Sequence, residues 1–198
     1  IASPYYTTNY NVSITDLNNC VKDTFMTLYV DTLLPQAVAS NDTSLCFGEE
    51  VELYVSGGQN YNWSPSSSLN NPSVSIPIAS PINTTLYTVS SSNGCGIAYD
   101  SVLVSVHQVI ASIVSDSAVC IGETVSLWAS GGDSYFWEPS FLFSTPTNAS
   151  VNTTLFLPTL FNVEVSKNIN SSLSCSLSLS VFVDTLPLPY VELGNDIN

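Results

Sequence analysis

The chain repeats itself, and this feature limits its possible folds more than any other. Residues 45–53, Leu-Cys-Phe-Gly-Glu-Glu-Val-Glu-Leu, return at 119–127 as Val-Cys-Ile-Gly-Glu-Thr-Val-Ser-Leu. Both copies continue at one constant offset through Ser-Gly-Gly into Tyr-x-Trp-x-Pro. A period of this length exceeds that of ordinary solenoids, so each copy is expected to be a small domain with its own core.

The repeat predicts two complete domains, at residues 36–109 and 110–187. Residues 1–35 match the C-terminal part of a repeat, because their Thr-Thr-x-Tyr-x-Val pattern recurs late in the first complete copy. Residues 188–198 are interpreted as a linker and the start of a further repeat. We therefore expect the sequence to be a window on a longer repetitive polypeptide, so its lack of a signal peptide says nothing about the parent.

The composition is acidic but not that of a disordered tail. Two basic residues stand against 16 acidic ones, yet only 9% of the residues are charged and 44% are hydrophobic. Disordered acidic segments lack so much apolar content. A surface nearly without Lys and Arg cannot neutralise phosphates, which excludes nucleic acid and makes anionic membranes poor partners. The sequence also contains no membrane span.

The 5 Cys residues indicate an oxidising compartment and an exported protein. Cys46 and Cys95 bracket the first complete repeat and Cys120 and Cys175 the second, whereas Cys20 has the place of a second cysteine whose partner would precede the chain. Zinc is the alternative, but neither Cys-x-x-Cys nor a His cluster is present. One intradomain disulfide per repeat is therefore predicted. In the chain-entropy model each such bond stabilises its domain by ~4 kcal/mol, because it closes a long loop.

Alternation with a period of two dominates the sequence, and helical periodicity is absent. Val51, Leu53 and Val55 alternate with residues that face the other way, and the equivalent stretch at 124–129 repeats the pattern. Gly-Gly and Asn-Gly pairs between the apolar runs are turn signals. About six or seven short strands per repeat, with one disulfide and one early Trp, predict an antiparallel β-sandwich.

The Tyr-x-Trp-x-Pro motif supplies the expected core anchors, Trp63 and Trp137 with Tyr61 and Tyr135. Packing has to recur in every repeat of an array, whereas ligand binding does not. The recurrence of the motif therefore favours a structural role over a ligand platform.

These motifs carry a resemblance. Cys-x-Gly-Glu-x-Val-x-Leu, Ser-Gly-Gly-x-x-Tyr-x-Trp-x-Pro, Thr-Thr-x-Tyr-x-Val and Asn-Gly-Cys before a Val-rich strand are similar to the immunoglobulin-like (PKD-like) repeats of giant Bacteroidetes surface proteins associated with type IX secretion. The resemblance covers nearly the whole chain. It implies an all-β fold of tandem Ig-like antiparallel β-sandwich domains. The second repeat departs from the pattern at 167–174, where extra residues replace a compact Ser-Ser-Ser-Asn-Gly.

The sequence contains few residues in arrangements that are typical of catalysis. His107 is the only His and follows a strand on the side opposite its valines, which indicates a structural residue. No Ser-His-Asp or Cys-His arrangement is evident, and no carboxylate pair recurs as an acid and base. We expect no enzyme and no cofactor.

Calcium is the one metal worth considering, because extracellular arrays stiffen their joints with carboxylates. Asp42 and Asp116 precede the first Cys of each repeat, Asp196 has the matching place beyond them, and Glu49 and Glu123 follow the Gly of the Cys-x-Gly motif. This spacing is not a ligand-loop motif. Turn capping and solvation are the simpler interpretation.

Seven of the nine Asp residues are followed directly by Ser or Thr, which is more than the composition predicts. With an apolar third residue the pattern resembles the O-glycosylation motif of Bacteroidetes and predicts glycans at Thr32, Ser101, Ser117 and Thr185. Local hydrogen bonding at strand ends is the competing explanation. Asn-x-Ser/Thr sequons occur little more often than composition predicts and favour a eukaryotic glycoprotein only weakly.

The resemblance implies a spacer or stalk segment of a surface adhesin in adhesion or gliding motility, attached to the outer membrane of a Gram-negative bacterium. Its partners would be neighbouring repeats of the same chain, and surface polysaccharide or other cell-surface proteins. One alternative is a carbohydrate-binding module that uses the outward aromatics Tyr54, Trp128 and Phe136. Another is a subunit of a polymerising filament or sheath.

Overall fold

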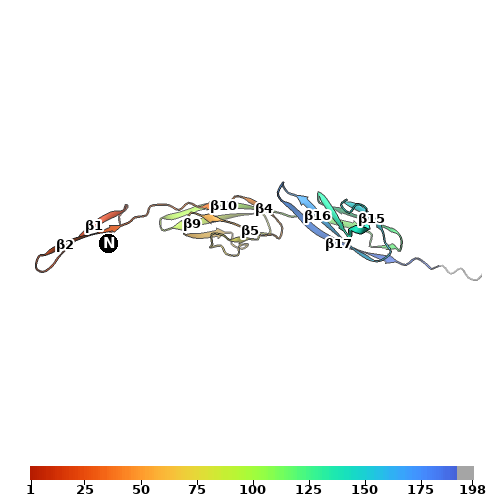
Figure 1. The fold of residues 1–198 in the computed structure, drawn as a ribbon, viewed down its shortest axis with the longest axis horizontal. Coiled ribbons are helices and arrows are strands. Elements are labelled where there is room, and N and C mark those ends of the chain that lie inside the picture. Colours follow the sequence, from red (N-terminus) through yellow and green to blue (C-terminus); the bar gives the residue numbers. More distant parts are fainter. Residues whose placement is uncertain (191–198) are drawn as a thin grey trace, which may run out of the picture. The chain divides into compact units, whose positions relative to one another are not determined.

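The computed structural model describes residues 1–190, and these contain β-strands and one short 3₁₀ helix (Figure 1). The chain forms two compact units. Unit 1 comprises Ile1–Thr43 and Gly48–Ser105, and unit 2 comprises Ser44–Phe47 and the chain from Val106 onward. The division after Ser105 lies close to the predicted boundary at 109/110. The short segment Ser44–Phe47 belongs to the first repeat by sequence and pairs with a strand of that repeat, although it is grouped with unit 2.

The second repeat folds into seven strands and the helix η1. They are β11 (Ser112–Ser115), β12 (Ala118–Cys120), β13 (Thr124–Ser130), β14 (Ser134–Glu138), η1 (Ser140–Leu142), β15 (Ser150–Thr154), β16 (Thr159–Asn168) and β17 (Ser174–Leu186). One sheet has the order β11-β13-β15 and the other β12-β17-β16-β14. The registered pairs are antiparallel except β12 with β17.

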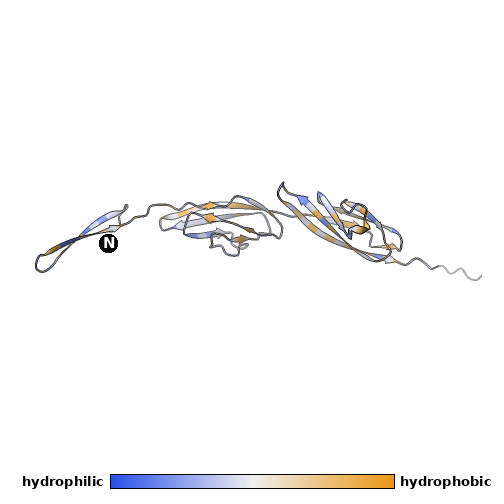
Figure 2. Ribbon diagram, in the orientation of Figure 1, coloured by the Kyte–Doolittle hydropathy of each residue, from blue (hydrophilic) through white to orange (hydrophobic). Residues whose placement is uncertain are grey.

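The two sheets enclose a core made of the inward residues of alternating strands. Along β13, Val125, Leu127 and Ala129 are buried while the residues between them are exposed. Trp137 on β14 packs edge-on against Phe143, which also contacts Phe161 on β16. Hydrophobic and hydrophilic residues alternate along the long strands in Figure 2. A sheet of three strands facing one of four, with a buried Trp on β14, is the immunoglobulin-like arrangement.

The first repeat builds an equivalent sandwich from β3 (Val38–Ala39), β4 (Thr43–Cys46), β5 (Val51–Glu52), β6 (Val55–Ser56), β7 (Asn60–Ser64), β8 (Ile78–Ala79), β9 (Thr85–Asn93) and β10 (Gly96–His107). One sheet has the order β4-β10-β9-β7, and the other is divided into the pairs β3-β6 and β5-β8. Trp63, Tyr87 and Val89 are fully buried at the positions of Trp137, Phe161 and Val163. The predicted fold class, tandem Ig-like antiparallel sandwiches, is confirmed.

Pro77 explains why one sheet of the first sandwich is divided. Leu53 donates its N–H to the carbonyl oxygen of Pro77 at 2.9 Å, but Pro77 has no N–H to return the bond. The second repeat has Val151 at this position, paired with Leu127 in a continuous ladder. A single residue therefore interrupts the strand that the alternating pattern predicts over 51–56.

Residues before the first sandwich form a hairpin of β1 (Thr8–Thr15) and β2 (Val21–Leu28). Its apolar residues are largely exposed, with Val12 at 43%, Ile14 at 61% and Phe25 at 72%. The two strands match the positions of β9 and the start of β10. The hairpin lies within residues 1–35, where the sequence predicts the C-terminal part of a repeat. The predicted start of another repeat at 191–198 lies outside the described residues.

Candidate functional site: the disulfide and the outward faces

Cys46 and Cys175 form the disulfide found among the described residues, with their Cα atoms 5.5 Å apart and a sequence separation of 129. Both residues belong to unit 2. By sequence, however, Cys46 is the first cysteine of the first repeat and Cys175 is the second cysteine of the second repeat. The bond therefore joins two consecutive repeats covalently.

The predicted intradomain pairs, Cys46 with Cys95 and Cys120 with Cys175, are wrong. Cys120 aligns with Leu186 at the end of β17, whereas Cys175 lies at the start of that 13-residue strand. At ~3.3 Å per residue the two cysteines are roughly 35 Å apart. A disulfide requires Cα atoms within about 7 Å, so these two cysteines cannot meet.

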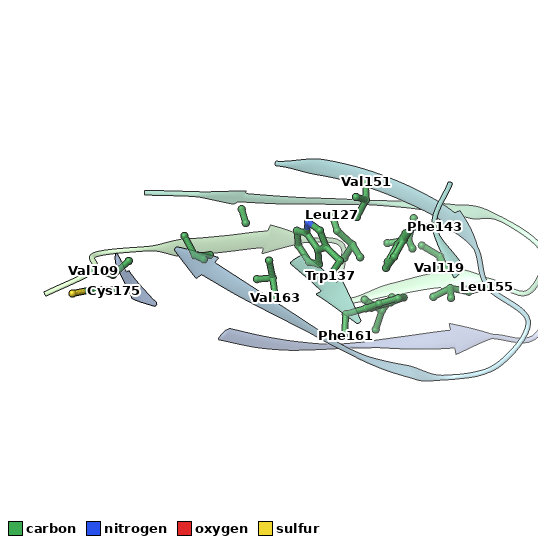
Figure 3. Packing of buried hydrophobic residues seen from close by; sticks show 14 residues of the cluster. Val109, Val119, Leu127, Trp137, Phe143, Val151, Leu155, Phe161, Val163 and Cys175 are labelled. Atoms are coloured by element: carbon green, nitrogen blue, oxygen red, sulfur yellow. The ribbon is translucent and has the colours of Figure 1, made fainter. Parts of the chain in front are cut away.

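The first repeat separates its two cysteines in the same way. Cys95 directly precedes the 12-residue strand β10, and the residue after Cys46 donates its N–H to the carbonyl oxygen of His107 at the other end of that strand. Cys20, Cys95 and Cys120 are free thiols. The sequence predicts that Cys20 is unpaired within this chain, but it also predicts disulfide partners for Cys95 and Cys120. Figure 3 shows Cys175 beside Val109 at one end of the core cluster.

A shallow hollow surrounds the disulfide. Cys46, Phe47, His107, Gln108, Val109 and Cys175 are among the residues that line it. Val109 is buried, and Cys175 is 2% exposed within the core cluster of the second sandwich. The only His is therefore close to sulfur that is already oxidised to a disulfide. This arrangement offers no thiolate for a Cys-His nucleophile.

The Trp and Tyr residues of the repeated motif hold the turn and the core together. Trp63 and Trp137 are 1% and 0% exposed. The Nε1–H of Trp137 donates to the carbonyl oxygen of Asn148 at 2.9 Å. The hydroxyls of Tyr61 and Tyr135 donate to the carbonyl oxygens of Gly58 and Gly132, at 2.8 Å and 3.0 Å. These contacts account for the spacing of Ser-Gly-Gly-x-x-Tyr-x-Trp.

The outward aromatics do not form one platform. Trp128, which is 61% exposed, lies on β13 of the three-stranded sheet. Phe136, 42% exposed, lies on β14 of the opposite sheet. Tyr54, 48% exposed, belongs to the first sandwich, between β5 and β6. Each aromatic is accessible, but Trp128 and Phe136 face away from each other across the second sandwich.

The residues predicted to carry O-linked glycans are accessible for the most part. Thr32, Ser101 and Ser117 are exposed, and Thr185 is half-buried. The preceding Asp residues make local bonds: Asp100 Oδ1 accepts the N–H of Ser101, and Asp184 Oδ1 accepts the N–H of Thr185, both at 2.8 Å. These bonds give the Asp-Ser/Thr pattern a structural use. Glycosylation at the four positions stays a prediction.

Two of the carboxylates considered for calcium accept backbone hydrogen bonds. Asp42 Oδ1 accepts the N–H of Leu103 at 2.8 Å, and Glu123 Oε2 accepts the N–H of Cys120 at 3.2 Å. Within residues 1–190, no three His, Cys, Asp or Glu side chains come together as a metal site. Asp196 lies outside the described residues. No helix of the described chain could span a membrane.

Comparisons with known proteins return structures but no families. No family model matches the chain, and no curated protein matches it. The N-terminal eight Ig domains of Down Syndrome Cell Adhesion Molecule match with a TM-score of 0.48 and 13% identity, covering 89% of this chain and 31% of that chain. Sidekick-1 immunoglobulin domains 1–4 match with a TM-score of 0.39 and 13% identity, covering 91% and 58%.

A titin I-band fragment, I67–I69, also matches with a TM-score of 0.39 and 11% identity, covering 78% of this chain and 65% of that chain. All three scores lie below 0.5. The assignment of the fold therefore rests on the strand order, register and core of this chain itself.

Proposed function

We propose that this chain is a non-catalytic, load-bearing spacer segment of an extracellular surface adhesin or stalk. The observation that carries the proposal is the Cys46–Cys175 bond between consecutive repeats. Tandem sandwiches with an acidic, hydroxyl-rich surface and a disulfide suit the outside of a cell. The motif resemblance supports a parent protein on the surface of a Gram-negative bacterium, where neighbouring repeats would be the first partners.

The position of the bond has a mechanical consequence. Tension applied at the two chain ends would enter the covalent bond at Cys46 and leave it at Cys175. The segment between these residues, a sequence separation of 129, is then excluded from the path of the force. The cores that pack Trp63 and Trp137 fall inside this protected segment. An intradomain bridge would protect only part of one sandwich, whereas this bond spans parts of two.

Single-molecule stretching of the chain between its termini tests the proposal. With the disulfide intact, the segment between Cys46 and Cys175 is not expected to extend. Reduction should add roughly 450 Å of contour length, because 129 positions can each extend by ~3.5 Å. Equal lengths before and after confirmed reduction would contradict the load-bearing role.

Two serine variants are matched controls for the stretching experiment. Cys46→Ser should show the long extension without any reductant, because the bond cannot form. Cys120→Ser should behave like the native chain, since Cys120 is a free thiol. A long extension in Cys120→Ser under oxidising conditions would show that the force path runs through a different bond.

Carbohydrate binding is a second candidate function, favoured by the surroundings of Trp128. On the outer face of the same sheet, Trp128 pairs with Ser150, and Ser126 pairs with Asn152. Ser150, the cross-strand partner of Trp128, lines a hollow together with other hydroxyl and amide residues, including Asn148. An exposed indole beside polar groups can stack on a sugar ring whose hydroxyls those groups bind.

A glycan array tests this second candidate with two variants. Trp128→Ala should abolish binding to any glycan that the native chain retains. Phe136→Ala is the control, because Phe136 is also an exposed aromatic but lies on the opposite sheet. Absence of binding by the native chain, or equal loss in both variants, would reject a site at Trp128.

A further inference from the structure

The cysteines fall into two classes by their place in the repeat. A first-class cysteine ends the short strand before the Gly-Glu turn, as Cys46 ends β4 and Cys120 ends β12. A second-class cysteine lies at the start of the long last strand, as Cys95 does before β10 and Cys175 does in β17. The observed bond joins a first-class cysteine to the second-class cysteine of the next repeat.

Cys120 has the same backbone anchorage as the bonded Cys46. The residue after Cys46 donates its N–H to the carbonyl oxygen of His107 at 2.8 Å, and the residue after Cys120 donates to that of Leu186 at 3.0 Å. His107 and Leu186 are the last residues of β10 and β17. Both first-class cysteines are half-buried. Cys120 therefore has the same place at the end of the second sandwich that the disulfide-bonded Cys46 has at the end of the first.

Cys95 has the place in its repeat that the bonded Cys175 has in the next repeat. The sulfur of Cys95 lies 3.0 Å from the carbonyl oxygen of Asp31, in the segment that leads into the first sandwich. Cys175 lines a hollow together with Gln108 and Val109, in the segment that leads into the second sandwich. Each second-class cysteine thus lies where the segment from the preceding repeat arrives. Of these two cysteines, only Cys175 forms a disulfide within the described residues.

We propose that Cys120 and Cys95 are sites for further disulfides of the same kind. Cys120 bonds to the second-class cysteine of a repeat that follows, and Cys95 bonds to the first-class cysteine of a repeat that precedes. The partner is in each case another repeat of this class. The inference rests on the array described under the proposed function and extends it from one bond to every junction.

Each bond forms by oxidation of two thiols. The two sulfurs lose two protons and two electrons in total, and a disulfide oxidant such as glutathione disulfide accepts them and becomes two thiols. Pairing within a repeat does not compete, because a long strand of about 35–40 Å separates its two cysteines. The topology of the sandwich therefore directs each first-class cysteine to the following repeat.

The test adds one repeat to the chain. Residues 1–196 are followed by a second copy of residues 117–187, so that Asp196 takes the place of Asp116 before the added copy. The exposed Ser176 is changed to Thr in the added copy as a mass label. The oxidised protein is alkylated with iodoacetamide, digested without reductant and analysed by mass spectrometry.

The expected result is a peptide that links Cys120 to the labelled Cys175 of the added copy, together with the original Cys46–Cys175 link. Removing the added partner by Cys175→Ser in that copy should return Cys120 to the alkylated form. An alkylated Cys120 in the presence of the Cys46–Cys175 link would overturn this inference and leave the proposed function intact. Absence of the Cys46–Cys175 link would overturn both.

Discussion

At the scale of single residues, the two repeats provide a natural comparison at one buried position. Ser91 on β9 is 0% exposed, and its hydroxyl has no hydrogen-bond partner among the described residues. The equivalent position on β16 is Val165, also 0% exposed. A buried hydroxyl without a partner costs free energy that a valine side chain does not. One core site is therefore apolar in the second repeat and contains an unpaired hydroxyl in the first.

Ser91→Val is expected to raise the unfolding free energy of the first sandwich by about 1 kcal/mol. The reciprocal change, Val165→Ser, should lower that of the second sandwich by about 1–3 kcal/mol, because it buries a new hydroxyl. Gly58 and Gly132 both lie against this side chain and leave it room. Urea unfolding of each variant measures the effect. Destabilisation by both substitutions would show that the Ser91 hydroxyl has a hydrogen-bond partner in solution.

Asp100 gives the first sandwich a dependence on pH. The N–H of Ala39 and that of Ser101 each donate to its carboxylate at 2.8 Å, and they lower the pKa of Asp100 below the ordinary value of 3.8. A carboxylate whose folded pKa is depressed stabilises the fold above its unfolded pKa, and this contribution disappears as pH falls through the folded pKa.

Asp100→Asn should therefore lower the midpoint of unfolding at neutral pH, and the difference from the native chain should shrink below about pH 4. Denaturant unfolding at a series of pH values checks this. Asp116→Asn is the control at an exposed carboxylate. A gap between native chain and Asp100→Asn that stays constant down to the lowest pH would contradict the role of the charge.

The sequence is informative about some residues and silent about others. The repeated Tyr-x-Trp motif identifies Trp63 and Trp137, because a core position must recur with the fold. The burial of Ser91 could not be predicted, because no pattern distinguishes one serine from the many others in a Ser-rich chain. Asp100 also escapes, since its partner Ala39 is distant in sequence and only the folded chain brings them together.

At the scale of elements, the Ser-Gly-Gly turn connects the entering segment to the sandwich. Gly57 has a φ of +99°, and a Cβ there would lie 1.5 Å from the carbonyl oxygen of Gln36. Gln36 in turn donates its N–H to the carbonyl oxygen of Gly57 at 3.1 Å. Gly131 has the same relation to Ile110, with a Cβ position 2.1 Å from its carbonyl oxygen. The motif is therefore a contact with the linker as well as a turn.

Gly57→Ala is expected to destabilise the first sandwich by more than Gly48→Ala. Gly48 also has a positive φ, of +89°, but nothing lies within 4 Å of its Cβ position, so its substitution costs only the left-handed backbone, about 1–2 kcal/mol. The excess at Gly57 measures the contact with Gln36. Thermal unfolding of both variants compares them, and equal losses would mean that the linker is not held by this turn.

Strand positions follow the alternating pattern well, and the exceptions have local causes. The pattern at 124–129 lies within β13, whereas the same pattern at 51–56 is divided into β5 and β6. The difference comes from Pro77 on the facing segment, because proline lacks an N–H. The alternating pattern of residues 51–56 alone does not identify the segment that pairs with them. In the second repeat the predicted antiparallel pairing holds for β11, β13, β14, β15 and β16, whereas β12 pairs with β17 in parallel.

At the scale of the whole molecule, the cysteine pairing was the least predictable feature. The count of cysteines correctly indicates disulfide chemistry, but bracketing a repeat in sequence is not proximity in space. The distance becomes visible only once β10 and β17 are known to be continuous strands of 12 and 13 residues. Those lengths place the two cysteines of one repeat at opposite ends of its sandwich, so the bond has to reach the next repeat.

The most direct test of this account is the identity of the linked cysteines in the native chain. The oxidised protein is alkylated, digested without reductant and examined by mass spectrometry. The account predicts one cross-linked peptide pair, Cys46 with Cys175, and alkylated Cys20, Cys95 and Cys120. Peptides that link Cys46 to Cys95 and Cys120 to Cys175 would contradict it.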